Sequence, residues 1–343
     1  MELSRRKREI LGAIINTYIE TGEPVGSKML ATLLNTGLSS ATLRNEMSEL
    51  CEMGYLKQPH TSAGRTPTGD GIRFYLSKLM PALPPTPQMQ RSMDRTVEQL
   101  PCNTELLIPA AAQALSELTG LPTVSAVVAH PSAQILAASV ARIGSNTLLL
   151  SVLTSGGISG SRICKTVWPL TDEQIFRFNR IVEEEIKGKP LDAFTAVSMQ
   201  TISIAAGADG LLLSPVLGCL FELATELTRA RLSVRGAENL YGYSEFMQDI
   251  AELLKLSGKQ DALIGLLGKT DTPVSVILGE DSGIPALRAS SIVLAGYPIC
   301  GSRIGRIGVI GPIRLNYPQL IPGIEYFSAA LAKKLSAVFE SEE

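Results

Sequence analysis

The sequence predicts a multidomain α+β protein, and three observations support this fold class. The first 80 residues carry three short amphipathic helices followed by a small hairpin. A proline-dense stretch at residues 81–90, PALPPTPQMQ, then breaks regular structure. The rest of the chain runs from strands to helices and back to strands, which is typical of an α+β domain interrupted by a helical insertion. With 343 residues, the chain is long enough for two or three domains.

The helices of the first 80 residues have recognisable ends. Ser4 suits the N-cap of a first helix that Gly22 ends, and a second helix starts at Ser27. Ser39 suits the N-cap of a third helix, and Gly54 is placed to cap its C-terminus.

The third helix has two unlike faces. At 100° per residue, one face collects apolar side chains: Leu43, Met47, Leu50 and Cys51. The opposite face collects Ala41, Arg44, Asn45, Ser48 and Glu52, with Thr42 and Glu49 at its flank. Small and hydrogen-bonding groups fill the N-terminal half of this second face. We interpret it as a surface that approaches another molecule closely.

A basic loop follows the third helix. The stretch KQPHTSAGRT, residues 57–66, contains Lys57, His60 and Arg65 but no acid. Three helices followed by a hairpin predict a winged helix-turn-helix unit, whose third helix enters the DNA major groove while the wing lies along the backbone or the minor groove. A further helix over 70–80 is expected to close the module, with Phe74 and Tyr75 in its core.

Composition restricts how DNA could be bound. The net charge is -2, so a broadly basic coat is excluded, but the first 80 residues carry ten Lys and Arg against eight Asp and Glu. DNA contact therefore has to come from a local patch. Five scattered cysteines without a C-x-x-C pair indicate free thiols in a reducing compartment. No signal peptide is recognisable, and the longest uncharged run, 118–141, holds two prolines, so a cytoplasmic protein without a membrane span is expected.

Beyond the prolines we expect a linker helix over 91–100 and then several strands and helices. Strands are predicted at TVSAVVAH, ILAASVARI, TLLLSVLT, SRICKTVWP, RLSVRG, VSVILGED, SSIVLAGYP and RIGVIGPIRL. Helices are predicted at 171–187, 191–206, 214–229, 243–255 and 324–339.

No motif in the sequence gives positive evidence for catalysis. The glycine run at 301–311 lacks the G-x-G-x-x-G spacing and a Walker lysine, so we interpret it as a turn and a strand. His60 and His130 have no nucleophile motif beside them, and no carboxylates have metal-ligand spacing. Trp168 is interpreted as a packing anchor. The sequence thus predicts neither an enzyme nor a cofactor.

Several motifs resemble those of the bacterial heat-inducible transcription repressor family, HrcA. They are YIETGEPVGS (18–27), LSSATLRNEMSELCEMGYLKQPHTSAGRTPT (38–68), GIRFYLSKLM (71–80), RGAENL (235–240), SSIVLAGY (290–297) and GRIGVIGPIRLNY (305–317). The second motif is long and specific. The resemblance spans essentially the whole chain, and it is looser between about residues 80 and 235.

This resemblance implies a dimeric repressor of chaperonin and heat-shock chaperone operons, binding an inverted-repeat operator known as CIRCE. It also implies that the GroEL chaperonin keeps the repressor active. The implied domains are a winged-helix domain (1–80), a proline-rich hinge and linker (81–103), a GAF-like α+β domain (104–144 and 241–343) and an inserted, mostly helical dimerisation domain (145–240).

The resemblance also carries over candidate DNA-binding residues. The major groove would be faced by Ser39, Ser40, Thr42, Arg44, Asn45 and Ser48. The wing would contain Lys57, Gln58, His60, Thr61, Ser62 and Arg65. Arg44 and Asn45 are expected to read bases, because arginine pairs bidentately with guanine and asparagine with adenine. Lys57 and Arg65 are assigned to phosphate.

Two other functions stay open at this point. The GAF-like domain could sense a small molecule that changes operator affinity. Alternatively, the chain could be an enzyme that its N-terminal module recruits to DNA, although no catalytic constellation supports this.

Overall fold

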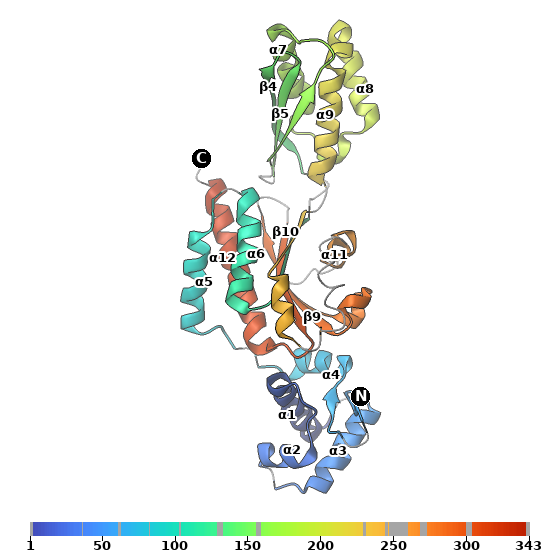
Figure 1. The fold of residues 1–343 in the computed structure, drawn as a ribbon, viewed down its shortest axis with the longest axis vertical. Coiled ribbons are helices and arrows are strands. Elements are labelled where there is room, and N and C mark those ends of the chain that lie inside the picture. Colours follow the sequence, from blue (N-terminus) through green and yellow to red (C-terminus); the bar gives the residue numbers. More distant parts are fainter. Residues whose placement is uncertain are drawn as a thin grey trace.

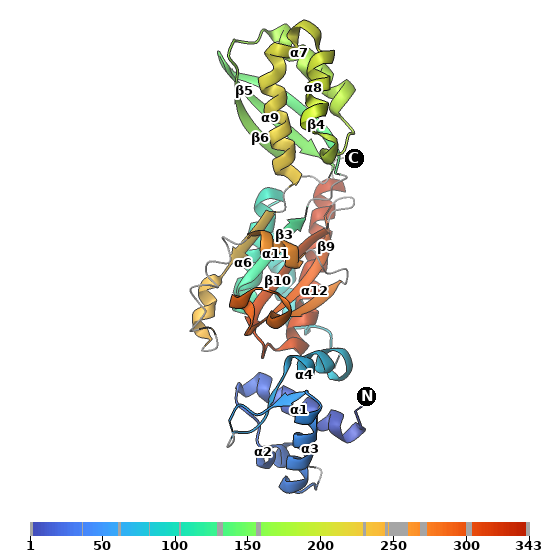
Figure 2. The ribbon, with the colours of Figure 1, turned by 90° about the vertical axis from the view of Figure 1, so that its right-hand side faces the viewer.

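The chain folds into three units that follow one another along a single long axis, seen from two sides in Figures 1 and 2. The computed structural model describes residues 3–35, 37–60, 63–81, 83–102, 104–128, 133–155, 159–228, 231–243, 246, 260–267, 273–299 and 304–340. The N-terminal unit lies at one end, a five-stranded sheet with its helices lies in the middle, and a three-stranded sheet with its helices lies at the other end.

The N-terminal unit consists of short helices and one hairpin. Its elements are α1 (Arg5–Thr21), α2 (Ser27–Leu34), α3 (Ser40–Glu52), β1 (Leu56–Lys57), β2 (Thr66–Pro67) and α4 (Gly69–Phe74), which continues as a π-helical turn, Tyr75–Leu79. The Ser4 hydroxyl accepts a hydrogen bond from the Lys7 amide, and Ser39 accepts one from the Thr42 amide. Gly22 and Gly54 adopt the left-handed conformation, with φ of 73° and 84°. The predicted ends of α1 and α3 are confirmed.

The apolar faces of these helices form one core. Leu43, Met47 and Leu50 of α3 are buried against α1 and α2, and Cys51 is half-buried at the edge. Tyr75 is buried as expected, and Phe74 is half-buried with its ring 5.3 Å from that of Tyr55. Because the apolar side of α3 is occupied, its polar side faces outward.

The central unit is built on an antiparallel sheet in the order β7-β3-β10-β9-β8. The strands are β3 (Thr123–Val128), β7 (Arg231–Arg235), β8 (Val274–Leu278), β9 (Ser290–Pro298) and β10 (Ile304–Pro312). One face of the sheet is covered by α5 (Pro87–Gln99), α6 (Thr104–Thr119) and α12 (Tyr317–Glu340). The other face carries α11 (Gln260–Leu267) and short 3-10 turns at Ala237–Gly242, Gly279–Asp281 and Pro285–Leu287.

Helix α5 is part of this central unit. It lies along α12, its Met93 and Val97 are buried, and the Tyr326 hydroxyl donates to the Asp94 carboxylate at 3.0 Å. The sequence suggested a linker helix here. The helix starts earlier than expected because Thr86 caps it ahead of a proline in its first turn.

The inserted unit leaves the central sheet after β3 and returns to it at β7. It contains β4 (Ile135–Gly144), β5 (Thr147–Thr154), β6 (Ser159–Lys165), α7 (Asp172–Ile181), α8 (Ala196–Ala205) and α9 (Gly210–Thr228). Its helices cover one face of the sheet β4-β5-β6, around a core separate from those of the central unit. Among the described helices, only α9 is long and apolar enough to span a membrane, and its buried leucines pack in this core.

The strand pairings differ from the expected domain borders of 144/145 and 240/241. Strand β4 pairs with β5 in the insertion, whereas β7 pairs with β3 in the central sheet. The crossings therefore lie between residues 128 and 135 and between 228 and 231. The insertion is also less helical than expected, since β4, β5 and β6 belong to it. The helix expected over 243–255 lies almost wholly outside the described residues, as do His130 and Cys300.

Candidate nucleic-acid interface

Helices α2 and α3 lie at the free end of the elongated molecule, opposite the inserted unit (Figures 1 and 2). Arg44 and Asn45 are exposed on α3 and have no hydrogen-bond or ion-pair partner within the described residues. Long polar side chains without partners at the tip of a molecule are available to bind another molecule. These two residues are the ones expected to read bases.

Two of the predicted site residues hold the start of α3. The Ser39 hydroxyl accepts a hydrogen bond from the Thr42 amide at 3.1 Å and lies 2.9 Å from the Thr42 hydroxyl. A side-chain cap of this kind stabilises a helix by about 1 kcal/mol. Ser39 and Thr42 therefore have a structural role at the helix end that faces outward.

Ser40 joins α3 to α2 instead of facing outward alone. Its hydroxyl lies 2.9 Å from the hydroxyl of Ser27, the first residue of α2, in a partly buried contact. Ser48 is half-buried. Of the six α3 residues predicted to face DNA, Ser39, Arg44 and Asn45 are therefore the exposed ones.

The hairpin is fixed to the helices by its returning strand. Leu56 pairs with Pro67 and Lys57 with Thr66, and Arg65 exchanges two backbone hydrogen bonds of 2.9 Å with Val25 in the α1–α2 loop. A Cβ added at Gly64 would overlap the Val25 carbonyl, so this close approach requires glycine.

The side chains of the hairpin have different surroundings. The Gln58 amide donates to the Ala63 carbonyl at 3.1 Å and so closes the loop on itself. Lys57 and His60 are exposed. Thr61 and Ser62 lie outside the described residues.

Two of the three acids of α3, Glu46 and Glu49, form ion pairs with cations of α1. Glu46 lies 2.9 Å from the Lys7 ammonium and 3.6 Å from Arg6, and Lys7 also reaches Glu49 at 2.7 Å. The hydrogen bonds to Glu49 and then to Glu46 raise the pKa of Lys7 above its usual value. Because Glu46 and Glu49 pair with these cations of α1, neither carboxylate forms an ion pair with Arg44.

A groove of about 580 Å³ lies beside α3, and cationic side chains line it. The lining residues are Gly26, Ser27, Lys28, Arg44, Met47, Gln58, Ala63, Gly64 and Arg65. Three of these nine residues carry a positive charge and none carries a carboxylate. The Arg65 Nε atom is buried there without a hydrogen-bond partner in the described structure. The groove is suited to an anion, because its uncompensated positive charge lies on three different elements.

Sequence reasoning missed Lys28. This exposed lysine is the second residue of α2 and shares the groove with Arg44 and Arg65. Its only signal in the sequence is that it directly follows a helix start. Which groove a first-turn lysine lines depends on how α2 packs on α3 and the hairpin.

The glycine motifs have ordinary structural surroundings, but Trp168 differs from the prediction. The glycines from 305 to 311 lie in β10, and those at 207–210 form a turn and the start of α9. Trp168 is 66 % exposed, so its interpretation as a packing anchor was wrong. The neighbouring Val167 is also exposed, because β6 has ended and the chain runs over the surface toward α7.

Comparison with known proteins connects this geometry to a family. Residues 105–321, more than half of the chain, match the family described as the HrcA protein C terminal domain. A crystal structure described as a hypothetical protein superposes with a TM-score of 0.61 and 25% identity, covering 98% of this chain and 100% of that one.

Curated relatives match nearly end to end. The chain is 31% identical to the heat-inducible transcription repressor HrcA of Acetivibrio thermocellus, with 96% of each chain covered. It is 30% identical to the protein of the same name from Symbiobacterium thermophilum, with 96% of this chain and 97% of that one covered. For Moorella thermoacetica the identity is 29%, over 99% and 100%.

Proposed function

The chain belongs to the HrcA family of heat-inducible transcription repressors, and from this premise we propose that it represses heat-shock chaperone operons by binding an inverted-repeat operator, CIRCE, as a dimer. The observation that carries the proposal is the partnerless pair Arg44 and Asn45 at the free end of the molecule, beside a groove lined by three cations. We further propose that the protein acts in the cytoplasm and has no catalytic activity.

In this proposal the N-terminal unit is a winged helix, with α3 as its recognition helix. Helix α3 enters the major groove, where Arg44 and Asn45 contact base edges. Ser39 and Thr42 hold the helix end that points at the DNA, and Ser40 and Ser48 border it. Lys57, His60 and the loop residues Thr61 and Ser62 form the wing, with Gln58 bracing it. The return strand of the hairpin brings Arg65 toward the phosphate backbone of the DNA.

The groove beside α3 is proposed to hold a backbone phosphate. Arg65 and Lys28 supply charge from the wing and from α2, while Arg44 is shared between the groove and the bases. Phosphate contacts of this kind fix the position of a recognition helix but carry no sequence information. The small net positive charge of the N-terminal unit makes each such contact important.

Replacing Lys28 with glutamine is expected to weaken binding to operator and random DNA by the same factor, because phosphate contacts are independent of sequence. The slope of log K against log salt should become shallower by about one unit. Fluorescence anisotropy titrations between low and physiological salt would measure both quantities. The matched control is Lys78→Gln, an exposed lysine of the same unit outside the groove, which should leave the slope unchanged. Equal slopes for the two variants would remove Lys28 from the interface.

The inserted unit is proposed to form the dimer through the open face of its sheet. Three aligned rows cross this face: Ala137, Leu153 and Ser159; Ser139, Ser151 and Ser161; Ala141, Leu149 and Ile163. None of these nine residues is charged. Leu153 is 41 % exposed and Ile163 61 %. An uncharged patch with small side chains at its centre suits packing on its own copy about a two-fold axis.

The central unit is proposed to be a GAF-like domain that connects the DNA-binding and dimerisation units. The GroEL chaperonin is proposed as the partner that keeps the repressor active. Exposed apolar side chains on α8 and α9 support an interaction of this kind: Val197, Ile204 and Leu211 are 71 %, 80 % and 88 % exposed. Helices α8 and α9 pack against each other, so these side chains lie on neighbouring elements, as in a protein-interaction site.

Gel-shift titrations on the inverted repeat upstream of the host chaperonin operon test the proposed function. Operator binding should exceed binding to scrambled DNA, increase with added chaperonin and fall at heat-shock temperature. Binding that ignores the inverted repeat would overturn the proposal. If binding is specific for the operator but a chaperonin does not change it, the proposed DNA-binding function is supported and the proposed chaperonin partner is not.

A further inference from the structure

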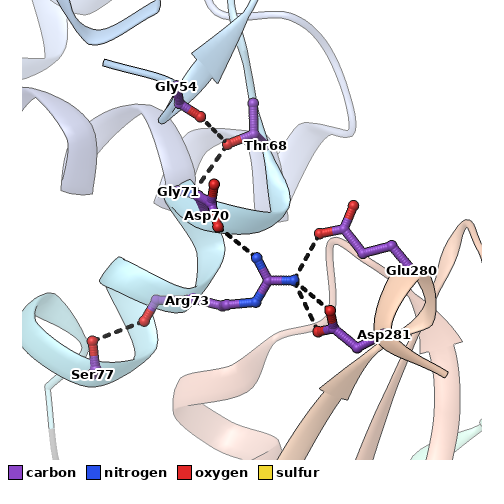
Figure 3. Close-up of polar contacts among 8 residues, drawn as sticks. All are labelled: Gly54, Thr68, Asp70, Gly71, Arg73, Ser77, Glu280 and Asp281. Atoms are coloured by element: carbon purple, nitrogen blue, oxygen red, sulfur yellow. Dashed lines mark hydrogen bonds and ion pairs between the residues drawn. The ribbon is translucent and has the colours of Figure 1, made fainter.

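One arginine connects the N-terminal unit to the central unit by ion pairs, as Figure 3 shows. Arg73 of α4 donates from Nη1 to Asp70 of its own helix at 2.6 Å. Its Nη2 lies 2.9 Å from Glu280 Oε1 and 2.8 Å from each carboxylate oxygen of Asp281. Glu280 and Asp281 belong to the turn that follows β8, 207 and 208 residues further along the chain. A single guanidinium thus contacts three carboxylates of two units.

The backbone around this contact is shaped for close approach. A Cβ added at Gly69, the first residue of α4, would overlap the Glu280 carboxylate, so a glycine admits the acid. At a second point, a Cβ added at Gly22 would lie 3.0 Å from the Arg314 Nε atom of the central unit. The buried apolar cluster also runs from α1 through to α12. Apolar packing therefore holds the two units together, and the ion pairs of Arg73 fix how α4 is oriented on the central unit.

The Arg73 contact and the free end of the N-terminal unit lie at opposite ends of that unit (Figure 1). A small turn of the unit about the contact therefore moves the end that is proposed to face DNA. Thr68 caps α4 through Gly71 and also donates to the Gly54 carbonyl at 2.6 Å, directly after α3. Helix α3, the hairpin end and α4 are therefore coupled at short range. A fixed guanidinium position on the central unit sets the orientation of α4, and with it the direction in which α3 points.

We propose that Arg73 is a positioning residue that sets which spacing of operator half-sites the dimer accepts. The proposal rests on the proposed function, since it requires two DNA-reading units joined by a dimer. A dimer of helix-turn-helix units reads two half-sites at a separation that its own geometry dictates. If the Arg73 contact is lost, apolar packing still holds the N-terminal unit on the central unit, but its orientation is less strictly set, and the preference for one spacing weakens.

The test compares Arg73→Gln with wild-type protein on three kinds of duplex: the native inverted repeat, repeats whose half-sites are moved apart or together by two base pairs, and a single half-site. For Arg73→Gln, affinity for the native repeat should fall about fivefold to tenfold, since two partly exposed networks are lost per dimer. Affinity for the single half-site should stay at the wild-type value. The ratio of native to altered spacing should therefore shrink.

Two further variants make the test specific. Arg5→Gln removes an exposed ion pair with Glu9 inside α1 and should keep the wild-type spacing profile. Gly69→Ala displaces Glu280 without changing any charge and should flatten the profile in the same direction as Arg73→Gln, by a smaller factor. The single half-site measurement also reports whether each variant is folded.

The outcomes separate the positioning role from the proposed function. A wild-type protein that does not distinguish the operator from random DNA would defeat the proposed function itself. Operator-specific wild-type protein, together with an unchanged spacing profile for Arg73→Gln, would overturn the role of Arg73 alone. Equal losses of Arg73→Gln on the single half-site and the full repeat would also overturn it, because they would indicate damage within the reading unit.

Discussion

Replacing Arg44 with alanine is expected to weaken binding to the cognate operator by about 1–3 kcal/mol and to relax base preference at one position of each half-site. The reason is geometric. Arg44 is exposed and has no partner within the described residues, and the nearby Glu46 and Glu49 are paired with cations of α1. Its guanidinium is free to form a bidentate pair with a guanine. Competition titrations with operators carrying single base changes would measure the relaxed preference.

The control for Arg44 is Lys57→Ala in the wing. Lys57 is assigned to phosphate, so its removal should reduce affinity for operator and random DNA equally and make the salt dependence shallower. If both variants lose affinity in the same proportion on specific and random DNA, Arg44 reads no base. Its role would then be limited to the cationic groove that it shares with Lys28 and Arg65.

Replacing Ile163 with aspartate is expected to convert the dimer into monomers and to reduce operator affinity by about a hundredfold, because binding of the second half-site would no longer be intramolecular. Ile163 is 61 % exposed at the centre of β6, so the isolated protomer does not need it for folding. In a dimer built on this face, the carboxylate would be buried without a partner. Sedimentation velocity and anisotropy titrations would report the two effects.

Ile204→Asp is the matched control for the dimer face. Ile204 is 80 % exposed but lies on α8, which covers the opposite side of the sheet. It should leave both the dimer and operator affinity in the absence of chaperonin unchanged. If Ile204→Asp gives monomers while Ile163→Asp does not, the helical side of the inserted unit forms the dimer.

Features that depend on neighbouring residues were predictable from the sequence. The Ser39 cap, the buried stripe of α3 and the left-handed Gly54 follow from helical spacing and from the preferences of serine and glycine. The same is true of β9 and β10, whose apolar runs are long. In each case the determinants lie within a few residues of the element.

Features that depend on distant residues were not predictable in this way. Ser40 was assigned to the reading face by its helical angle, but its hydroxyl meets Ser27 of another helix. Lys28 reaches the groove through the packing of α2 on α3. The borders of the insertion depend on which strands pair. Buried and exposed residues alternate along part of β4, but this pattern does not show that β4 pairs with β5 rather than with β3. Strand pairing depends on tertiary contacts, which the periodicity of the sequence alone does not encode.

The insertion begins and ends at adjacent strands of the central sheet, and this has a consequence for how the protein could have been assembled. Val127 of β3 stands directly opposite Arg231 of β7, so about one hundred residues leave and return at nearly the same point. The central sheet would close equally well over a short loop. A domain attached in this way can be gained, lost or exchanged in evolution without disturbing the fold that carries it. The same attachment point would accept a foreign oligomerisation module, giving the DNA-reading end a different symmetry.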